Sequence, residues 1–224
     1  MAQASKKKPA PPKATTVLFI RHGENEWTSS HKLAGRTPGV HLNEQGKKQA
    51  IALGKRLAKV KLNAIYASPL ERTMETAQAI ANHHQLEVQP EPELLEVDYG
   101  KWTGKEIAKL AKKKSWPVIQ FYPSSAGFPG GETMYEMQTR FVKAINRLVK
   151  DHPEQTIAVV GHADLIKSAV AHYLGVHFDL FQRIVISTAS ITTVSFMPMG
   201  PRVVCVNDTN HNPPPPKDKD KKPK

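Results

Sequence analysis

The chain has 224 residues and a formal net charge of +12, with 39% hydrophobic and 23% charged residues. This length suffices for one sizeable core, the composition is that of a globular domain, and no apolar stretch is long enough to span a membrane. Four lysines in residues 1–14, and five lysines with two aspartates in residues 212–224, supply +7 of the charge, so the middle of the chain is only mildly basic.

Both ends of the chain are rich in lysine and proline and poor in large apolar side chains. We expect residues 1–14 and 208–224 to be disordered tails that aid solubility, rather than segments that contact RNA, DNA or anionic lipid. No aromatic residue lies between their lysines, so we expect no specific nucleic-acid partner. The first fourteen residues lack the apolar segment of a signal peptide, and a single cysteine fits a reducing compartment, so we expect a cytoplasmic location. Cys205 itself lies in an apolar run and is predicted to be buried.

Between the tails the sequence alternates predicted strands and helices, the pattern of a mostly parallel sheet covered on both faces. The predicted strands are Thr15–Ile20, Asn63–Tyr66, an edge strand at Leu86–Val88, Thr156–Val160, and a closing pair at Ser190–Phe196 and Val203–Val206. The predicted helices run from about Asn43 to Val60, Pro69 to His84, Glu132 to Lys150 and Asp164 to Leu174. We therefore predict an α/β fold, a three-layer αβα sandwich with a mostly parallel six-stranded sheet, in a single domain of residues 15–207.

Three of the predicted strands end in reactive side chains. Arg21 and His22 follow the first strand, Arg72 lies shortly after the second, and His162 follows the strand at Thr156–Val160. A single Arg-His pair is more often a solvated strand end. However, the carboxyl ends of parallel strands open on the same side of a sheet, so these two imidazoles and two guanidinium groups can converge there. Such a cluster suits a phosphoryl group, whose charge spreads over three oxygens that need several fixed donors.

The motifs and their order resemble those of the histidine phosphatase superfamily, which includes the cofactor-dependent phosphoglycerate mutases. The matching segments are residues 21–24, 42–50, 68–77, 95–104, 129–132 and 161–162. Further likeness in residues 35–41 and 181–184 is to a bacterial branch labelled as phosphomutases or phosphatases. The resemblance implies a phosphoglycerate mutase-like fold and an enzyme of the histidine acid phosphatase and phosphomutase type.

The resemblance also implies roles for particular residues. His22 would be the nucleophile that forms a phosphohistidine, and Glu96 would protonate the leaving oxygen and then activate water. The catalytic residues it implies are Arg21, His22, Arg72, Glu96 and His162, and the substrate-binding residues are Arg21, Thr28, Gly35, Arg72, Tyr99 and Ala163. Two positions depart from the usual pattern: Thr28 stands where the family has a phosphate-binding asparagine, and Ala163 replaces a glycine.

The chemistry adds two expectations about these groups. The ring nitrogen of His22 opposite to the attacking one should donate to a backbone carbonyl, such as that of Gly23. The pKa of Glu96 stays open, because nearby arginines lower it whereas burial and the substrate phosphate raise it.

No zinc-ligand spacing and no Gly-rich nucleotide loop is present, so we expect neither a metal site nor a cofactor. The expected partner is a small phosphorylated substrate, with no membrane insertion, and the chain is expected to be a monomer or a homodimer. Residues 97–131, rich in Gly, Pro, Lys and aromatic residues, are predicted to be an insertion over the active site. Its aromatic residues would ordinarily be core, but their place in the insertion lets some of them wall the substrate pocket: Trp116, Phe121, Tyr122 and Phe128.

Three functions compete: a phosphomonoesterase for a small metabolite, a phosphoglycerate-type mutase, and a binding module that recognises phosphorylated ligands. The complete set of reactive residues disfavours the binding module. A mutase must exclude water and hold the substrate carboxylate. However, no arginine lies between Glu96 and Gln138, and the C-terminal segment has no apolar anchor with which to close over a site. The sequence therefore favours a metal-independent phosphatase.

Overall fold

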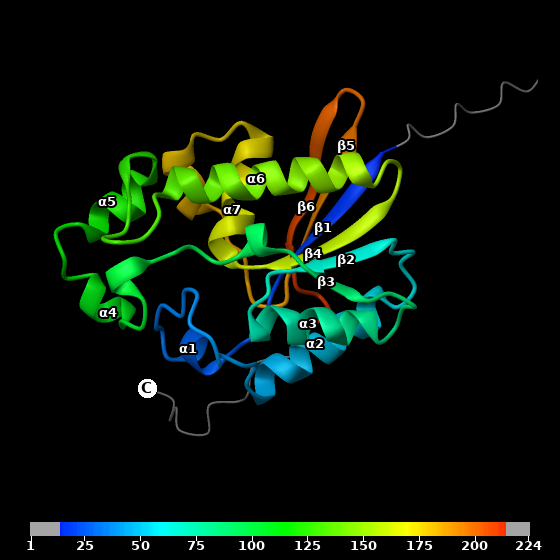
Figure 1. Cartoon of the computed structure of the whole chain (residues 1–224), viewed down its shortest axis with the longest axis horizontal. Helices are drawn as coiled ribbons and strands as arrows, with labels where there is room; N and C mark the ends of the chain where they lie inside the picture. The colour runs from blue at the N-terminus through cyan, green and yellow to red at the C-terminus, as the bar shows by residue number, and fades with distance from the viewer. Residues whose placement is uncertain (1–13, 214–224) are drawn as a thin grey trace, which may run out of the picture.

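The computed structural model describes residues 14–213, so most of the two predicted tails lies outside the described residues (Figure 1). The strands are β1 (Thr15–Arg21), β2 (Ala64–Ala67), β3 (Val88–Pro90), β4 (Thr156–Gly161), β5 (Ile191–Met197) and β6 (Gly200–Asp208). The α-helices are α1 (Glu26–Ser29), α2 (Glu44–Leu57), α3 (Glu71–Ala81), α4 (Ile107–Leu110), α5 (Trp116–Phe121), α6 (Met134–Asp151) and α7 (Ala163–Leu174). Short 3₁₀ helices are η1 (Pro92–Leu94), η2 (Gly100–Trp102), η3 (Pro123–Ser125) and η4 (Phe178–Arg183).

The six strands form one sheet in the order β3-β2-β4-β1-β5-β6. β1, β2, β3 and β4 pair in parallel, whereas β5 runs antiparallel to both of its neighbours, β1 and β6. This confirms the predicted mostly parallel sheet, the edge position of β3 and the adjacent closing pair. The carboxyl ends of β1, β2 and β4 consequently lie next to one another, which is the arrangement that the convergence of reactive groups requires.

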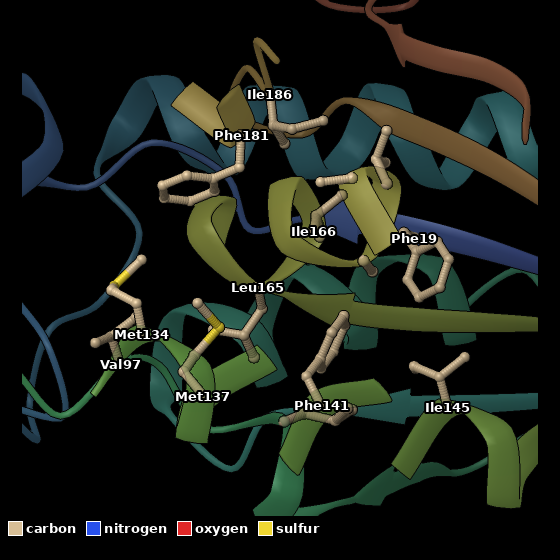
Figure 2. Close-up of a cluster of buried hydrophobic side chains, with 14 of the residues drawn as sticks. Phe19, Val97, Met134, Met137, Phe141, Ile145, Leu165, Ile166, Phe181 and Ile186 are labelled. Carbon is tan, nitrogen blue, oxygen red and sulfur yellow. The ribbon is translucent and has the colours of Figure 1, made fainter. Parts of the chain in front are cut away.

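β1 shows why the central strands are continuously apolar. Val17 and Phe19 face the hydrophobic cluster that contains α6 and α7, while Leu18 and Ile20 face the cluster that contains α2 and α3. Figure 2 shows Phe19 directed toward side chains of α6, where its ring centroid lies 5.9 Å from that of Phe141. Because successive side chains of a strand point to opposite faces, a strand buried on both faces needs apolar residues throughout. Helices on both faces confirm the three-layer sandwich.

Helix boundaries follow local capping. The Asn43 side chain accepts a hydrogen bond from the Gly46 amide, which confirms the predicted start of α2. Thr133 and Glu136 form a reciprocal capping box, so α6 begins at Met134, two residues later than predicted. α3 begins at Glu71 instead of Pro69 and ends at Ala81, three residues before His84.

The structure differs from three predictions about which residues are buried or ordered. Cys205 is exposed, so its predicted burial is wrong: β6 is an edge strand that pairs with β5 alone. Phe121 and Tyr122 are also exposed, at 66% and 62% of their surface. Residues 208–212, predicted to belong to the tail, include His211 and Asn212, which hydrogen-bond to the carbonyls of residues 189 and 188. Within residues 14–213, no helix is long and apolar enough to cross a membrane.

Candidate active site

A cavity of about 480 Å³ opens at the carboxyl end of the sheet, where β1 and β2 end. Eight of the residues named from the sequence line it: Arg21, His22, Thr28, Gly35, Arg72, Glu96, Tyr99 and Ala163. The ninth, His162, lies beside them, since its ring centroid is 5.3 Å from that of His22. The fold thus brings together side chains from four separate parts of the chain.

His22 occupies the turn that leaves β1 and is only 4% exposed. Its Nδ1 lies 2.7 Å from the carbonyl oxygen of Gly23, as expected, so Nδ1 carries the proton and donates it. Burial, reinforced by the charges of Arg72 and Arg21, holds the pKa of His22 well below its ordinary value. Within the described part of the chain the ring makes its hydrogen bond through Nδ1, and Nε2 has no partner there. A neutral imidazole with an unengaged Nε2 is the form that can act as a nucleophile.

Gly23 is required because two backbone segments meet there. A Cβ on Gly23 would lie 2.7 Å from the carbonyl oxygen of Gly46 in α2, closer than a side chain can approach. The amide of Gly23 also donates to the Thr76 hydroxyl of α3 at 3.0 Å. Contacts with α2 and α3 therefore fix the turn that carries His22.

Two guanidinium groups are each anchored at one nitrogen and leave other nitrogens unpaired. Nη2 of Arg72 donates to the Gly35 carbonyl at 2.8 Å, and Nη1 of Arg21 donates to the Ile186 carbonyl at 2.8 Å. Nε and Nη1 of Arg72 and Nε of Arg21 are buried and have no partner in the described part of the chain. Buried donors are nearly always satisfied, so these unpaired groups point to a ligand that accepts hydrogen bonds, and their charge favours an anion.

His162 is fully buried between β4 and α7. Its Nε2 lies 3.0 Å from the hydroxyl of Ser68, and its Nδ1 lies 3.5 Å from Nη2 of Arg72 and 3.6 Å from Oε2 of Glu96. Burial first, and then the charge of Arg72, lowers the pKa of His162 well below its ordinary value. Ser68, which follows β2, thereby fixes the ring orientation of a histidine that follows β4.

Glu96 lies in the segment between η1 and η2 and is 9% exposed. Its Oε1 accepts a hydrogen bond of 2.9 Å from the amide of Val97. Burial, with a smaller contribution from the charge of Asp164, raises its pKa to about 7 despite the opposing arginines. The question left open by the sequence is therefore decided by burial, and the carboxyl group can give up and take back a proton near neutral pH.

The remaining residues named from the sequence line the cavity, and three of them also make contacts within the protein. The Thr28 hydroxyl donates to the Asn25 side chain, the Gly35 carbonyl holds Arg72, and the Tyr99 hydroxyl donates to Asp164 at 3.1 Å. None of the four aromatic residues considered for the pocket wall lines the cavity: Trp116, Phe121, Tyr122 and Phe128. The cavity wall has Trp27 and Tyr99 instead.

Sequence reasoning missed several polar residues of the cavity, namely Asn25, Asp164, Lys167 and Gln182. Asn25 directly follows the motif Arg21–Glu24, and Asp164 follows His162 by two residues, so closeness to those motifs was the available signal. Lys167 contacts Gln182 at 2.9 Å and Asp164 at 3.5 Å. Lys167 lies one turn after Asp164 on α7, so both side chains are on the same side of this helix. That placement could be inferred only after the start of α7 at Ala163 was known.

The chain is similar in sequence to a phosphatase and to a protein named as a probable phosphoglycerate mutase. The chain is 30% identical over 200 residues to phosphoserine phosphatase 1 of Hydrogenobacter thermophilus, covering 87% of this chain and 93% of the relative. It is 28% identical over 180 residues to a probable phosphoglycerate mutase GpmB of Erwinia tasmaniensis, covering 80% and 83% of the two chains.

The chain is also similar in overall fold to solved structures. YhfR of Bacillus stearothermophilus superposes with a TM-score of 0.84 at 26% identity, over 89% of this chain and 100% of that one. Phosphoserine phosphatase of Entamoeba histolytica, solved with 3-phosphoglyceric acid, gives a TM-score of 0.78 at 27% identity, over 88% and 98%. The pattern of the histidine phosphatase superfamily (branch 1) matches residues 17–209. The chain therefore belongs to the histidine phosphatase superfamily, branch 1.

Proposed function

We propose that this protein hydrolyses phosphomonoesters of small metabolites through a phosphohistidine formed on His22. One observation carries the proposal: His22, whose Nε2 is unengaged among the described residues, shares a cavity with buried, unpaired N–H groups of Arg21 and Arg72. A nucleophile beside fixed cationic donors is the arrangement that stabilises a phosphoryl group in transfer.

In the first step Nε2 of His22 attacks phosphorus and the ester P–O bond breaks. The electron pair of that bond stays on the leaving oxygen, which takes the proton of the neutral Glu96 carboxyl group. A pKa of about 7 keeps a large fraction of Glu96 protonated at neutral pH, as this step requires. The hydrogen bond from Nδ1 to the Gly23 carbonyl stabilises the positive charge that develops on the ring.

In the second step a water molecule attacks phosphorus and the P–N bond breaks. Glu96, now a carboxylate, takes a proton from that water, and His22 leaves as a neutral imidazole. The products are an alcohol and inorganic phosphate, and the enzyme returns to its starting protonation state. The guanidinium groups of Arg21 and Arg72 supply the charge that a metal ion would otherwise supply, so the proposed reaction needs no metal or other cofactor.

For the substrate we propose a phosphomonoester that also carries a carboxylate, as phosphoserine and 3-phosphoglycerate do. The names of the Hydrogenobacter and Entamoeba relatives, and the acid bound in the latter, support this class. Lys32 and Lys167 line the cavity and supply cations that a carboxylate could meet. Mutase activity is the alternative, since the Erwinia relative carries that name.

The test compares two activities of one preparation. Release of inorganic phosphate from 3-phosphoglycerate, phosphoserine and p-nitrophenyl phosphate should proceed in EDTA. Interconversion of 3- and 2-phosphoglycerate should be slow by comparison. An acid-labile phosphoenzyme should be trapped from labelled substrate in the wild type and be absent in His22→Ala. Rapid interconversion with negligible hydrolysis would instead establish a mutase, and ligand binding without turnover would establish a binding module.

A further inference from the structure

Asn25 is a buried polar residue of the cavity that the proposed reaction does not yet use. Its side chain is directed into the protein at the start of α1, and the residue is only 1% exposed. Its Oδ1 accepts three hydrogen bonds: from the amide of Trp27 at 3.0 Å, and from the amide and hydroxyl of Thr28 at 2.9 Å and 3.2 Å. Asn25 and Thr28 both line the cavity that contains His22.

These contacts fix which way the amide of Asn25 faces. Backbone N–H groups can only donate, so the atom that meets the Trp27 and Thr28 amides must be the oxygen. A flipped amide would set its NH₂ group against two N–H donors. Nδ2 is therefore held on the opposite side, where it is buried and has no hydrogen-bond partner within residues 14–213.

A buried NH₂ group without an acceptor is costly, and a ligand that accepts its hydrogen bonds would remove that cost. Three further unpaired buried donors belong to residues of the same cavity: Nε of Arg21, and Nε and Nη1 of Arg72. The three oxygens of a phosphoryl group can accept more hydrogen bonds than these guanidinium atoms supply.

We propose that Nδ2 of Asn25 donates a hydrogen bond to a phosphoryl oxygen of the substrate, and that the Thr28 hydroxyl adds to the two backbone amides that hold the Asn25 amide in place for this contact. The proposal rests on the proposed function, because it concerns the same phosphoryl site. Thr28 is thereby a positioning residue whose hydroxyl is engaged with Asn25. The family resemblance implies a phosphate-binding asparagine at position 28, where this chain has Thr28. In the proposal, Asn25 provides the amide donor from three residues earlier in the chain.

The experiment measures binding of inorganic phosphate at equilibrium by titration calorimetry, together with kcat and KM for p-nitrophenyl phosphate. Asn25→Thr keeps a side-chain oxygen that can cap α1 but removes the NH₂ donor. Asn25→Asp keeps both the shape and the cap and replaces the donor by a negatively charged oxygen. Each variant should raise the Kd for phosphate about 10- to 100-fold, as expected for losing a hydrogen bond to a charged group.

Two further variants separate ligand binding from folding. Asn25→Thr combined with Thr28→Asn moves the amide to position 28 and should recover at least tenfold of the lost phosphate affinity. Thr28→Val, which removes only the hydroxyl, should raise the Kd a few-fold and leave Tm close to that of the wild type. Ser30→Ala is the matched control: its hydroxyl bonds to the Glu26 carbonyl on the same helix and is absent from the cavity, so phosphate affinity should not change.

Phosphate affinity within twofold of the wild type in Asn25→Thr or Asn25→Asp would overturn the role of Asn25. Failure of the double variant to recover affinity would also overturn it, because the loss would then reflect an altered loop. If the wild type itself binds no phosphate, the proposed function fails along with this inference. Unchanged phosphate binding in the Asn25 variants of a wild-type enzyme that does bind phosphate removes this inference alone.

Discussion

Nη2 of Arg72 donates a hydrogen bond of 2.8 Å to the carbonyl oxygen of Gly35. Gly35 has a φ of +52°, and a Cβ at this position would lie 3.1 Å from Cδ2 of Tyr99 and 3.2 Å from Oγ1 of Thr103. Both the left-handed backbone and the close approach of Tyr99 and Thr103 favour a residue without a side chain at the position that presents its carbonyl to the guanidinium group. Gly35 thus acts on the phosphoryl site through Arg72.

Replacing Gly35 by alanine should reduce both stability and activity. A left-handed backbone costs alanine about 1 kcal/mol, and the tight contact with Tyr99 and Thr103 shifts the carbonyl that holds Arg72. The free energy of unfolding in urea and kcat/KM for p-nitrophenyl phosphate measure the two effects. Gly39→Ala is the control, because Gly39 has a φ of +73° with nothing within 4 Å of the added methyl group. It should lose stability without losing activity. Wild-type kcat/KM in Gly35→Ala would contradict the positioning role.

Arg72→Lys should lower kcat/KM by about 100- to 1,000-fold, although the positive charge is kept. A lysine cannot bond to the Gly35 carbonyl and to a phosphoryl oxygen with the planar fork of arginine. Steady-state kinetics with p-nitrophenyl phosphate measure the loss. Arg147→Lys is the control, since Arg147 is half-exposed and pairs with Glu91 and Glu93 away from the cavity. If both variants retained normal turnover, Arg72 would not contact the phosphoryl group.

Glu96→Gln should affect substrates according to their leaving groups. The leaving group of an alkyl phosphate such as 3-phosphoglycerate is a strongly basic alkoxide, which needs the proton of Glu96. Formation of the phosphoenzyme from such a substrate should therefore slow by about 100- to 10,000-fold. p-Nitrophenolate hardly needs a proton, so the single-turnover burst of nitrophenol should slow far less. Steady-state rates would not separate the two, because loss of the base slows the second step for every substrate. Equal losses would mean that Glu96 only shapes the cavity.

The pH dependence of the first step should follow the same carboxyl group. Glu96 must carry a proton to act as an acid, and burial raises its pKa to about 7. Single-turnover transfer from 3-phosphoglycerate should therefore fall as the pH rises through about 7. Transfer from p-nitrophenyl phosphate should show a weaker dependence in that range. A single-turnover rate for 3-phosphoglycerate that stays constant from about pH 6 to about pH 8 would argue against Glu96 as the acid.

Glu96 should also cost stability at high pH. Its pKa in the folded protein is about 7 against an ordinary 4.5, so between these values the folded state keeps a proton that the unfolded state releases. Stability from this group is full below about pH 4.5 and is lost as the pH rises to about 7. Glu96→Gln should therefore gain up to about 3 kcal/mol relative to the wild type between pH 4.5 and pH 8. Urea unfolding at both pH values measures this gain. The exposed Glu87, changed to Gln, should show no such difference.

Much of the fold and site could be predicted from local sequence pattern. The apolar run of β1 and the cap at Asn43 are each visible in a few consecutive residues, so they predicted their elements correctly. The placement of His22 and His162 at strand ends needed only one further rule, that parallel strands end on the same side of a sheet. These features could be predicted because each leaves a recognisable pattern in a few consecutive residues, even where the contacts that stabilise it are distant.

Tertiary structure alone decided which groups are covered and which donors are paired. An apolar run predicted burial for Cys205, but the edge position of β6 leaves that residue exposed. The pKa of Glu96 could not be read from the sequence, because it depends on the balance between burial and the charges of distant residues. The free Nδ2 of Asn25 follows from the orientation of its amide in the folded loop. Solvation and hydrogen-bond pairing depend on residues far apart in the chain, so they exist only once the chain has folded.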